Sequence, residues 1–284
     1  MTKHLIINAD DFGYAEGSVP ATIALHEAGV VTSTTALVNQ PCWPEAAAYL
    51  RDHPSLGAGV HLVMNEGRPI LPLERVGSLV NTEGYFRDGT PLLLRYGRLR
   101  TAELKAEWRA QIAKFFADTG RPPDHLDLHC YYPYVFPAWF RVSLELAQEY
   151  GHLPVRMPFD DALDSKAPEM AADNGFPIWY VSRQGRRYQR LVERYGLKRP
   201  NYFEMSFSQD GHRTTEYLLG LLDALPDGVT ELLAHPGTEG WREGDYYGLL
   251  NPRVRQHIGE LGIALITYGG LKQSPAPGSD TSIE

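Results

Sequence analysis

The stretch Leu5-Ile6-Ile7-Asn8-Ala9-Asp10-Asp11 begins with a short apolar run and ends with two carboxylates. Apolar runs that end in polar side chains recur along the chain. The short apolar run predicts a buried strand, and the carboxylates mark the place where that strand ends. Apolar residues at helical spacing follow over 15–27, and a β-branched run over 30–38 predicts the next strand. A strand, a helix and another strand in this order are typical of a parallel sheet with crossover helices.

The same alternation continues as far as residue 268. Further strands are predicted over 57–62, 125–129, 153–157, 229–235 and 263–268. Further helices are predicted over 44–51, 101–119, 137–150, 183–199, 214–225 and 252–261, and loops over 158–180 and 236–250. About seven strand–helix units predict an α/β fold, a distorted (β/α) barrel, with an open doubly wound sheet as the alternative.

Two stretches carry no core pattern. Residues 64–100 combine Gly and Pro clusters with little periodicity, so we expect a long insertion with a hairpin near 81–87. The tail over 274–284 holds turn-forming and polar residues, and we expect it to be disordered. The remainder, residues 1–273, is expected to form a single domain.

The composition predicts an ordered, acidic protein. Hydrophobic residues make up 43% of the 284 positions and charged residues 22%, which excludes wholesale disorder. The formal net charge of −8 disfavours nucleic acid as a partner. The first apolar run is too short for a signal peptide, and no stretch approaches the roughly 18 apolar residues of a membrane span. With only Cys42 and Cys130 as cysteines, we expect a cytoplasmic protein that does not contact a membrane.

Ionisable side chains stand at the ends of four predicted strands. They are Asp10 and Asp11, His61, Asp127 with His129, and His235. Because the carboxyl ends of parallel strands meet at one edge of a sheet, we expect these groups to share one mouth. A carboxylate with two histidines is a common open metal site, which leaves positions for water and substrate.

Each of these residues also has a purely structural interpretation. Asp10-Asp11 could cap the helix that follows. His61 or His129 could be a hydrogen-bonded core histidine, and His235-Pro236-Gly237 could be only a turn. Their coincidence at one predicted sheet edge favours a metal site more than any single residue does.

Three other features are also open to more than one interpretation. Cys130 is expected to pack on the strand face opposite His129. The arginine-rich run over 183–199 is typical of a solvated helix face, with a subunit contact or an anion-binding rim as the alternative. A group of aromatic residues could stack on sugar rings or anchor a loop. These aromatic residues are Tyr131, Tyr132, Tyr134, Phe136 and Trp139.

Five blocks of sequence carry a family resemblance. They are Leu5-Ile6-Ile7-Asn8-Ala9-Asp10-Asp11-Phe12-Gly13, Val31-Thr32-Ser33-Thr34-Thr35, Gly57-Ala58-Gly59-Val60-His61-Leu62, residues 119–129 and Glu231-Leu232-Leu233-Ala234-His235-Pro236-Gly237. Together they resemble the YdjC-like carbohydrate deacetylases, the family that contains chitooligosaccharide deacetylases. The chain departs from that family after His129, where relatives have further histidines and this chain has Cys130-Tyr131-Tyr132-Pro133.

The resemblance implies a distorted (β/α) barrel that removes the N-acetyl group from an N-acetylated sugar or small oligosaccharide and releases acetate. It implies a divalent metal held by Asp11, His61 and His129, with Asp10 as the base and His235 as the acid. It also implies a homodimer. Two imidazoles and a carboxylate favour Zn²⁺ as the metal, with Co²⁺, Mn²⁺ or Mg²⁺ as alternatives.

Substrate contacts are predicted for Arg156, Tyr131 and Tyr132, although Arg156 could instead orient Asp10 or lie on the surface. Two other functions stay open. A metal-dependent phosphoesterase or isomerase could use the same barrel, although phosphoesterases usually have a second metal and more carboxylates. A non-catalytic sugar-binding protein is the third possibility, against which the intact set of acidic and imidazole groups argues.

Overall fold

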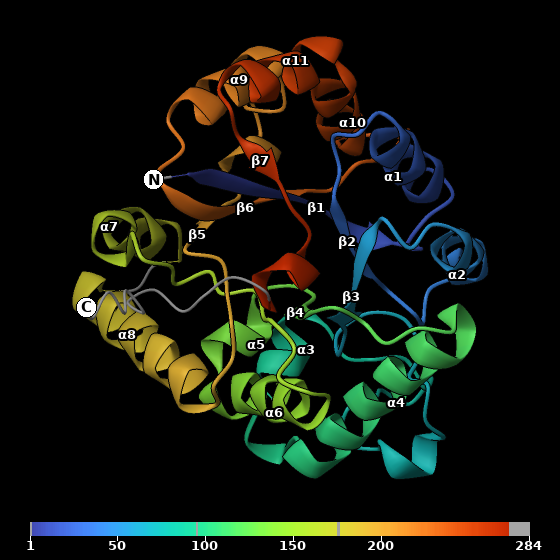
Figure 1. Cartoon of the computed structure of the whole chain (residues 1–284). Coiled ribbons are helices and arrows are strands. Elements are labelled where there is room, and N and C mark those ends of the chain that lie inside the picture. The colour runs from blue at the N-terminus through green and yellow to red at the C-terminus, as the bar shows by residue number, and fades with distance from the viewer. Residues whose placement is uncertain (1, 95, 175–176, 273–284) are drawn as a thin grey trace, which may run out of the picture.

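Parallel strands form the centre of the molecule, and helices surround them (Figure 1). The structure is a computed structural model that describes residues 2–94, 96–174 and 177–272. The strands are β1 (Lys3–Phe12), β2 (Ser33–Ala36), β3 (Gly57–Leu62), β4 (Leu126–Leu128), β5 (Tyr202–Glu204), β6 (Gly228–Ala234) and β7 (Ala264–Leu265). They lie in the order β4-β3-β2-β1-β6-β5, with β7 also paired to β1. The sheet is a half-barrel, which confirms the predicted α/β fold of distorted-barrel type.

Helices alternate with these strands along the chain. The longer ones are α1 (Ser18–Glu27), α2 (Trp43–Asp52), α4 (Thr101–Thr119), α6 (Pro137–Glu149), α7 (Leu163–Asn174), α8 (Ile178–Arg194), α9 (Thr215–Asp223), α10 (Arg242–Leu250) and α11 (Pro252–Glu260). Short helices are α3 (Gly89–Leu93) and α5 (Tyr132–Val135), and 3₁₀ turns cover Leu73–Arg75, Tyr96–Arg98, Ser206–Ser208 and Tyr268–Lys272. None of the described helices has both the length and the apolar character needed to span a bilayer.

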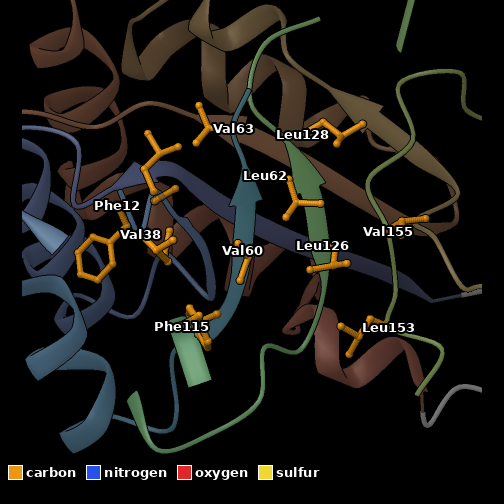
Figure 2. Packing of buried hydrophobic residues seen from close by; sticks show 14 of the residues in the cluster. Phe12, Val38, Val60, Leu62, Val63, Phe115, Leu126, Leu128, Leu153 and Val155 are labelled. Atoms are coloured by element: carbon orange, nitrogen blue, oxygen red, sulfur yellow. The ribbon is translucent and has the colours of Figure 1, made fainter. Parts of the chain in front are cut away.

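Helix α4 shows how the sequence pattern produces the core. Its predicted apolar face, which includes Trp108, Ile112 and Phe115, is fully buried. Gly120 then ends the helix in the left-handed region at φ +71°, which a residue without a Cβ adopts at little cost. Figure 2 shows Phe115 packed below Val60 of β3.

The predicted strand over 153–157 is wrong. In the structure Val155 makes one isolated parallel bridge to Leu126 of β4, and its amide donates to the carbonyl of Lys198. Proline lacks the amide proton that a ladder needs, and Pro154 and Pro158 bracket this segment. The segment therefore runs beside β4, where Figure 2 shows Leu153 and Val155, without continuing the sheet.

Several regular elements were not predicted, among them two longer helices and a strand. Helices α7 and α10 lie where loops were expected, and β5 has no counterpart in the predicted pattern. Pro168 sits inside α7, so its local sequence disfavours the helix that packing against α8 stabilises. The predicted strand over 263–268 is only the two residues of β7 followed by a 3₁₀ turn. The tail over 274–284 lies outside the described residues.

Hydrogen bonds hold the insertion over 64–100 against α4. Glu107 is fully buried, and its carboxylate accepts the backbone amides of Ile70 and Leu71 at 2.9 and 3.0 Å. Glu103 accepts the amide of Ser78 at 2.8 Å. The predicted hairpin is reduced to one antiparallel bridge between Val80 and Phe86.

Candidate active site

A bulge in β1 brings two consecutive carboxylates to the same mouth. Side chains alternate between the two faces of a regular strand, so Asp10 and Asp11 would otherwise point apart. The register with β2 shifts between Ala9 and Phe12, and Asp11 adopts φ +64°. Helix α1 has Gly17 at its N-cap with no capping side chain, so the helix-capping interpretation of Asp10-Asp11 is wrong.

The three predicted metal ligands converge. Asp11 Oδ1 lies 3.4 Å from His61 Nε2 and 3.3 Å from His129 Nδ1. The three residues come from β1, from β3 and from the turn that follows β4, and all three are buried. The structure therefore brings together side chains that are 50 and 118 positions from Asp11 along the chain.

The chemistry of this group suits a divalent cation. Asp11 Oδ1 is buried and accepts no hydrogen bond from any described residue. Ligand atoms that are each about 2.0–2.2 Å from a tetrahedral ion lie roughly 3.3–3.6 Å apart, which matches the two separations. Asp127 accepts a hydrogen bond from His61 Nδ1 and so turns Nε2 toward Asp11. A buried Asp–His–His cluster compatible with a metal is present.

Asp10 stands beside this cluster with its two oxygens differently engaged. Its Oδ1 accepts hydrogen bonds from Asn8 (2.7 Å), Thr35 (3.2 Å) and Arg156 Nη2 (2.6 Å). Its Oδ2 accepts one, from Arg156 Nη1 at 2.6 Å, and faces His235 Nε2 at 3.9 Å. Burial by itself would raise the pKa of Asp10, but the adjacent guanidinium outweighs burial and holds that pKa below its ordinary value.

Arg156 is buried among three carboxylates. Besides Asp10, it donates to Glu231 Oε1 from Nε (2.8 Å) and Nη2 (2.6 Å), and Nη1 lies 3.0 Å from Asp127 Oδ2. These contacts engage the guanidinium from every side, so the geometry favours the orienting role for Arg156 over substrate binding. Sequence analysis did not identify Glu231, although a lone carboxylate within the apolar run of β6 was a usable signal.

His235 is held at the opposite side of Asp10. Its Nδ1 lies 3.1 Å from Ser208 Oγ, which donates to Asp245 Oδ2, and the same oxygen accepts the backbone amide of His235 at 2.7 Å. Burial lowers the pKa of His235 despite the neighbouring carboxylates. Ser208 and Asp245 lie in a 3₁₀ turn and in α10, which the sequence pattern did not predict, so nothing in the sequence pointed to them.

Two further charged residues complete the surroundings of the cluster. Arg242 of α10 pairs with Asp11 Oδ2 at 2.6 Å, which leaves Oδ1 directed at the two imidazoles. Glu66 of the insertion lies 3.0 Å from His129 Nε2. Neither was identified from the sequence.

A cavity of about 530 Å³ opens onto Asp10, His61, His129 and His235. Tyr131 lines it and is 56% exposed, whereas Tyr132 is buried and is not among the lining residues. Cys130 also lines it and is exposed, so the prediction that Cys130 packs inside the fold is wrong. The backbone of Cys130 is left-handed at φ +65°, which ends the strand alternation on which that prediction relied.

The arginine-rich run forms part of α8. Val181, Tyr188 and Val192 of this helix are buried, while Arg183, Arg187 and Arg190 are exposed. This arrangement matches the expected solvated helix face.

The chain is similar to known proteins over most of its length. A family model described as YdjC-like protein matches residues 4–260. A carbohydrate deacetylase from Brevibacillus brevis is 39% identical over 94% of this chain and 99% of its own. One from Geobacillus stearothermophilus is 32% identical over 94% of this chain and 98% of its own. A crystal structure from Enterococcus faecalis, described as a cellobiose-phosphate cleavage protein, has a TM-score of 0.78, is 33% identical, and covers 95% of this chain and 99% of its own.

Proposed function

The chain belongs to the YdjC-like protein family, and on this basis we propose that it is a metal-dependent carbohydrate N-deacetylase, a hydrolase acting on linear amides. Its substrate is an N-acetylated sugar or small oligosaccharide, and its products are acetate and the free amine. The observation that carries the proposal is Asp10 Oδ2, which accepts only one hydrogen bond and lies at the same mouth as the Asp11–His61–His129 cluster.

Asp11, His61 and His129 are the residues that would hold the cation, with Zn²⁺ favoured by the two imidazoles. When bound there, a divalent cation polarises the amide carbonyl and lowers the pKa of water at the site. Arg242 keeps one oxygen of Asp11 occupied, and Asp127 keeps one nitrogen of His61 occupied. The remaining ligand atoms, Asp11 Oδ1 and His61 Nε2, therefore face each other.

Asp10 is the general base in this proposal. Oδ2 is the atom that takes the proton of the attacking water, because Oδ1 is already the acceptor of three hydrogen bonds. Arg156 fixes the plane of this carboxylate and keeps it ionised, which is the form that can accept a proton.

His235 is the general acid. As the water oxygen bonds to the carbonyl carbon and the C–N bond breaks, the amine nitrogen needs a proton to leave. His235 Nε2 faces Asp10 Oδ2 across the cavity, and Ser208 holds its other nitrogen. Tyr131 at the rim is the substrate contact that the cavity supports best among the predicted ones.

The test measures acetate released from N-acetylglucosamine and its oligomers, together with the metal content of each variant. We expect Asp10→Asn to keep its metal and lose activity roughly 100- to 10,000-fold. Asp11→Asn and His61→Ala should lose both. Asp52→Asn, at an exposed carboxylate of α2, is the control. Full activity of Asp10→Asn would contradict the base assignment, and unchanged turnover of His235→Ala would contradict the acid assignment.

We also propose that the protein is cytoplasmic and that it forms a homodimer. Both cysteines are free, which accords with the reducing cytoplasm. A homodimer is proposed from the family resemblance, and light scattering on the purified protein tests it. A monomeric mass would contradict the homodimer and would leave the proposed deacetylation unaffected.

A further inference from the structure

The cavity at the candidate active site is lined by two kinds of side chain. One kind is the ionisable groups described above. The other kind is apolar side chains from β4, α7, α8, β5 and β6 and from the segment before α7. These include Leu128, Phe159, Met170, Val181, Phe203 and Leu233. We call the part of the cavity that these apolar side chains line the apolar compartment.

Polar partners are scarce in the apolar compartment. Beyond the ionisable groups, the described lining residues with polar side chains are two glutamines and three tyrosines, namely Gln184, Gln209, Tyr131, Tyr134 and Tyr180. A sugar ring carries a hydroxyl on most of its carbons, and each hydroxyl buried without a hydrogen-bond partner is unfavourable. The compartment therefore suits a group that has few polar atoms.

An anionic group fits even less well. Arg156 is the one Lys or Arg among the described lining residues, and its guanidinium is already engaged with Asp10, Asp127 and Glu231. A phosphate bound against the apolar side chains would find no lysine or unengaged arginine among the described lining residues to pair with.

One lining tyrosine keeps its polar atom buried. Tyr134 lines the cavity, but its hydroxyl is buried and has no hydrogen-bond partner among the described residues. Burial raises the pKa of this hydroxyl, so it keeps its proton. The open cavity therefore does not offer this hydroxyl to a ligand as a polar partner.

We propose that the substrate carries an apolar group next to the reacting amide, and that the apolar compartment binds this group. The inference rests on the proposed deacetylase function and narrows its substrate to amphiphilic N-acylated sugars. The apolar group could be the substituent on the anomeric carbon or an acyl chain longer than acetyl, and both present the same chemistry to the compartment.

The experiment compares kcat/KM for amide hydrolysis of four substrates. They are N-acetylglucosamine, its octyl glycoside, N-octanoylglucosamine and N-acetylglucosamine 6-phosphate. We expect one of the two octyl compounds to exceed N-acetylglucosamine at least tenfold, which also identifies the source of the apolar group. The phosphate is expected to be the poorest substrate.

Variants tie the preference to the compartment. Met170→Glu places a carboxylate in its wall and should abolish the preference, measured as the ratio of kcat/KM for the octyl compound to kcat/KM for N-acetylglucosamine. Met205→Glu does the same from the rim, where the side chain is 49% exposed and folding is not at risk. Ala172→Glu, exposed on α7, is the matched control and should leave both kcat/KM values unchanged.

The outcomes separate the two proposals. Equal kcat/KM for N-acetylglucosamine and both octyl compounds, unaffected by Met205→Glu, would overturn the apolar compartment and leave the deacetylase intact. Absence of amide hydrolysis from all four substrates and from chitooligosaccharides would overturn the proposed function itself.

Discussion

Neighbouring arginines give two adjacent carboxylates different tasks. Asp10 and Asp11 are consecutive, equally buried and of one chemical type. Arg156 contacts both oxygens of Asp10, whereas Arg242 contacts only Oδ2 of Asp11. Asp11 therefore keeps a bare oxygen beside two imidazoles, and Asp10 is held as an oriented carboxylate. The difference arises from contacts made across the fold, 146 and 231 positions away in the chain.

Arg156→Lys tests the orienting contact. An ammonium keeps the charge but cannot make two parallel hydrogen bonds to one carboxylate, so we expect kcat to fall roughly 10- to 100-fold with little change in KM. Arg156→Met should instead destabilise the fold by about 3–5 kcal/mol, because three buried carboxylates lose their cation. Steady-state kinetics and chemical denaturation measure the two effects, with exposed Arg183→Lys as control. A normal kcat in Arg156→Lys would exclude a bidentate requirement.

Ser208→Ala tests the support of the proposed acid. Without Oγ, the ring of His235 loses the link from Nδ1 to Asp245, so its orientation and basicity change. We expect kcat to fall about tenfold and the pH profile of kcat to shift, while KM and metal content stay the same. Kinetics across pH measure this, and Ser208→Thr should restore part of the loss. A fall in stability with no shift of the pH profile would mean that Ser208 acts only structurally.

At the scale of elements, two glutamates of α4 hold the insertion against the barrel. Glu107 receives amides from residues 70 and 71, and Glu103 receives the amide of Ser78. Glu66, which contacts His129, belongs to the same insertion. The stability of this segment therefore bears on the surroundings of the candidate metal ligands.

Glu103→Gln tests how the insertion is anchored. Burial would raise the pKa of Glu103, but hydrogen bonds from Ser78 and the charge of Arg100 outweigh burial and lower it. A carboxyl with a lowered pKa in the folded state stabilises that state above its unfolded pKa, about 4.3, and this stabilisation is lost as pH falls through the folded value. We expect Glu103→Gln to cost about 1 kcal/mol at pH 7 and the difference from wild type to shrink below about pH 4.

Denaturant unfolding at several pH values measures that difference. Glu74→Gln, at an exposed glutamate of the same insertion, is the control and should show no pH-dependent difference. A Glu103→Gln effect that is constant from pH 7 to pH 3 would show that ionisation of this carboxyl does not contribute.

At the scale of the whole molecule, the cluster ties together distant parts of the barrel. Its three residues come from β1, β3 and the end of β4, so a ligand that binds all of them stabilises the folded state over the unfolded one. A free Zn²⁺ concentration about 1,000 times its Kd should add about 4 kcal/mol to the free energy of unfolding.

Thermal unfolding with Zn²⁺ and with a chelator measures this stabilisation. His61→Ala should lose the shift in Tm, whereas His257→Ala, at a histidine of α11 that pairs with Asp223, should keep it. An equal shift in His61→Ala would place the metal elsewhere.

Much of the architecture follows from local sequence. The apolar runs of β1, β3 and β6 and the periodic face of α4 predicted their elements, because burial of a strand or of one helix face leaves a direct mark on residue spacing. The same marks placed Asp10, Asp11, His61, His129 and His235 at one sheet edge. Helix α7, which contains a proline and is stabilised by its neighbours, has no such spacing of apolar residues that would have predicted it.

What the sequence by itself determined was the alternating fold and the residue types gathered at one mouth, since both depend on spacing along the chain. Only the tertiary structure decided which atoms of those residues are free. The bulge at Asp11, the guanidinium beneath Asp10 and the link from His235 through Ser208 to Asp245 join positions with no regular spacing. Such contacts arise from packing in three dimensions, and a single sequence carries no periodic signal for them.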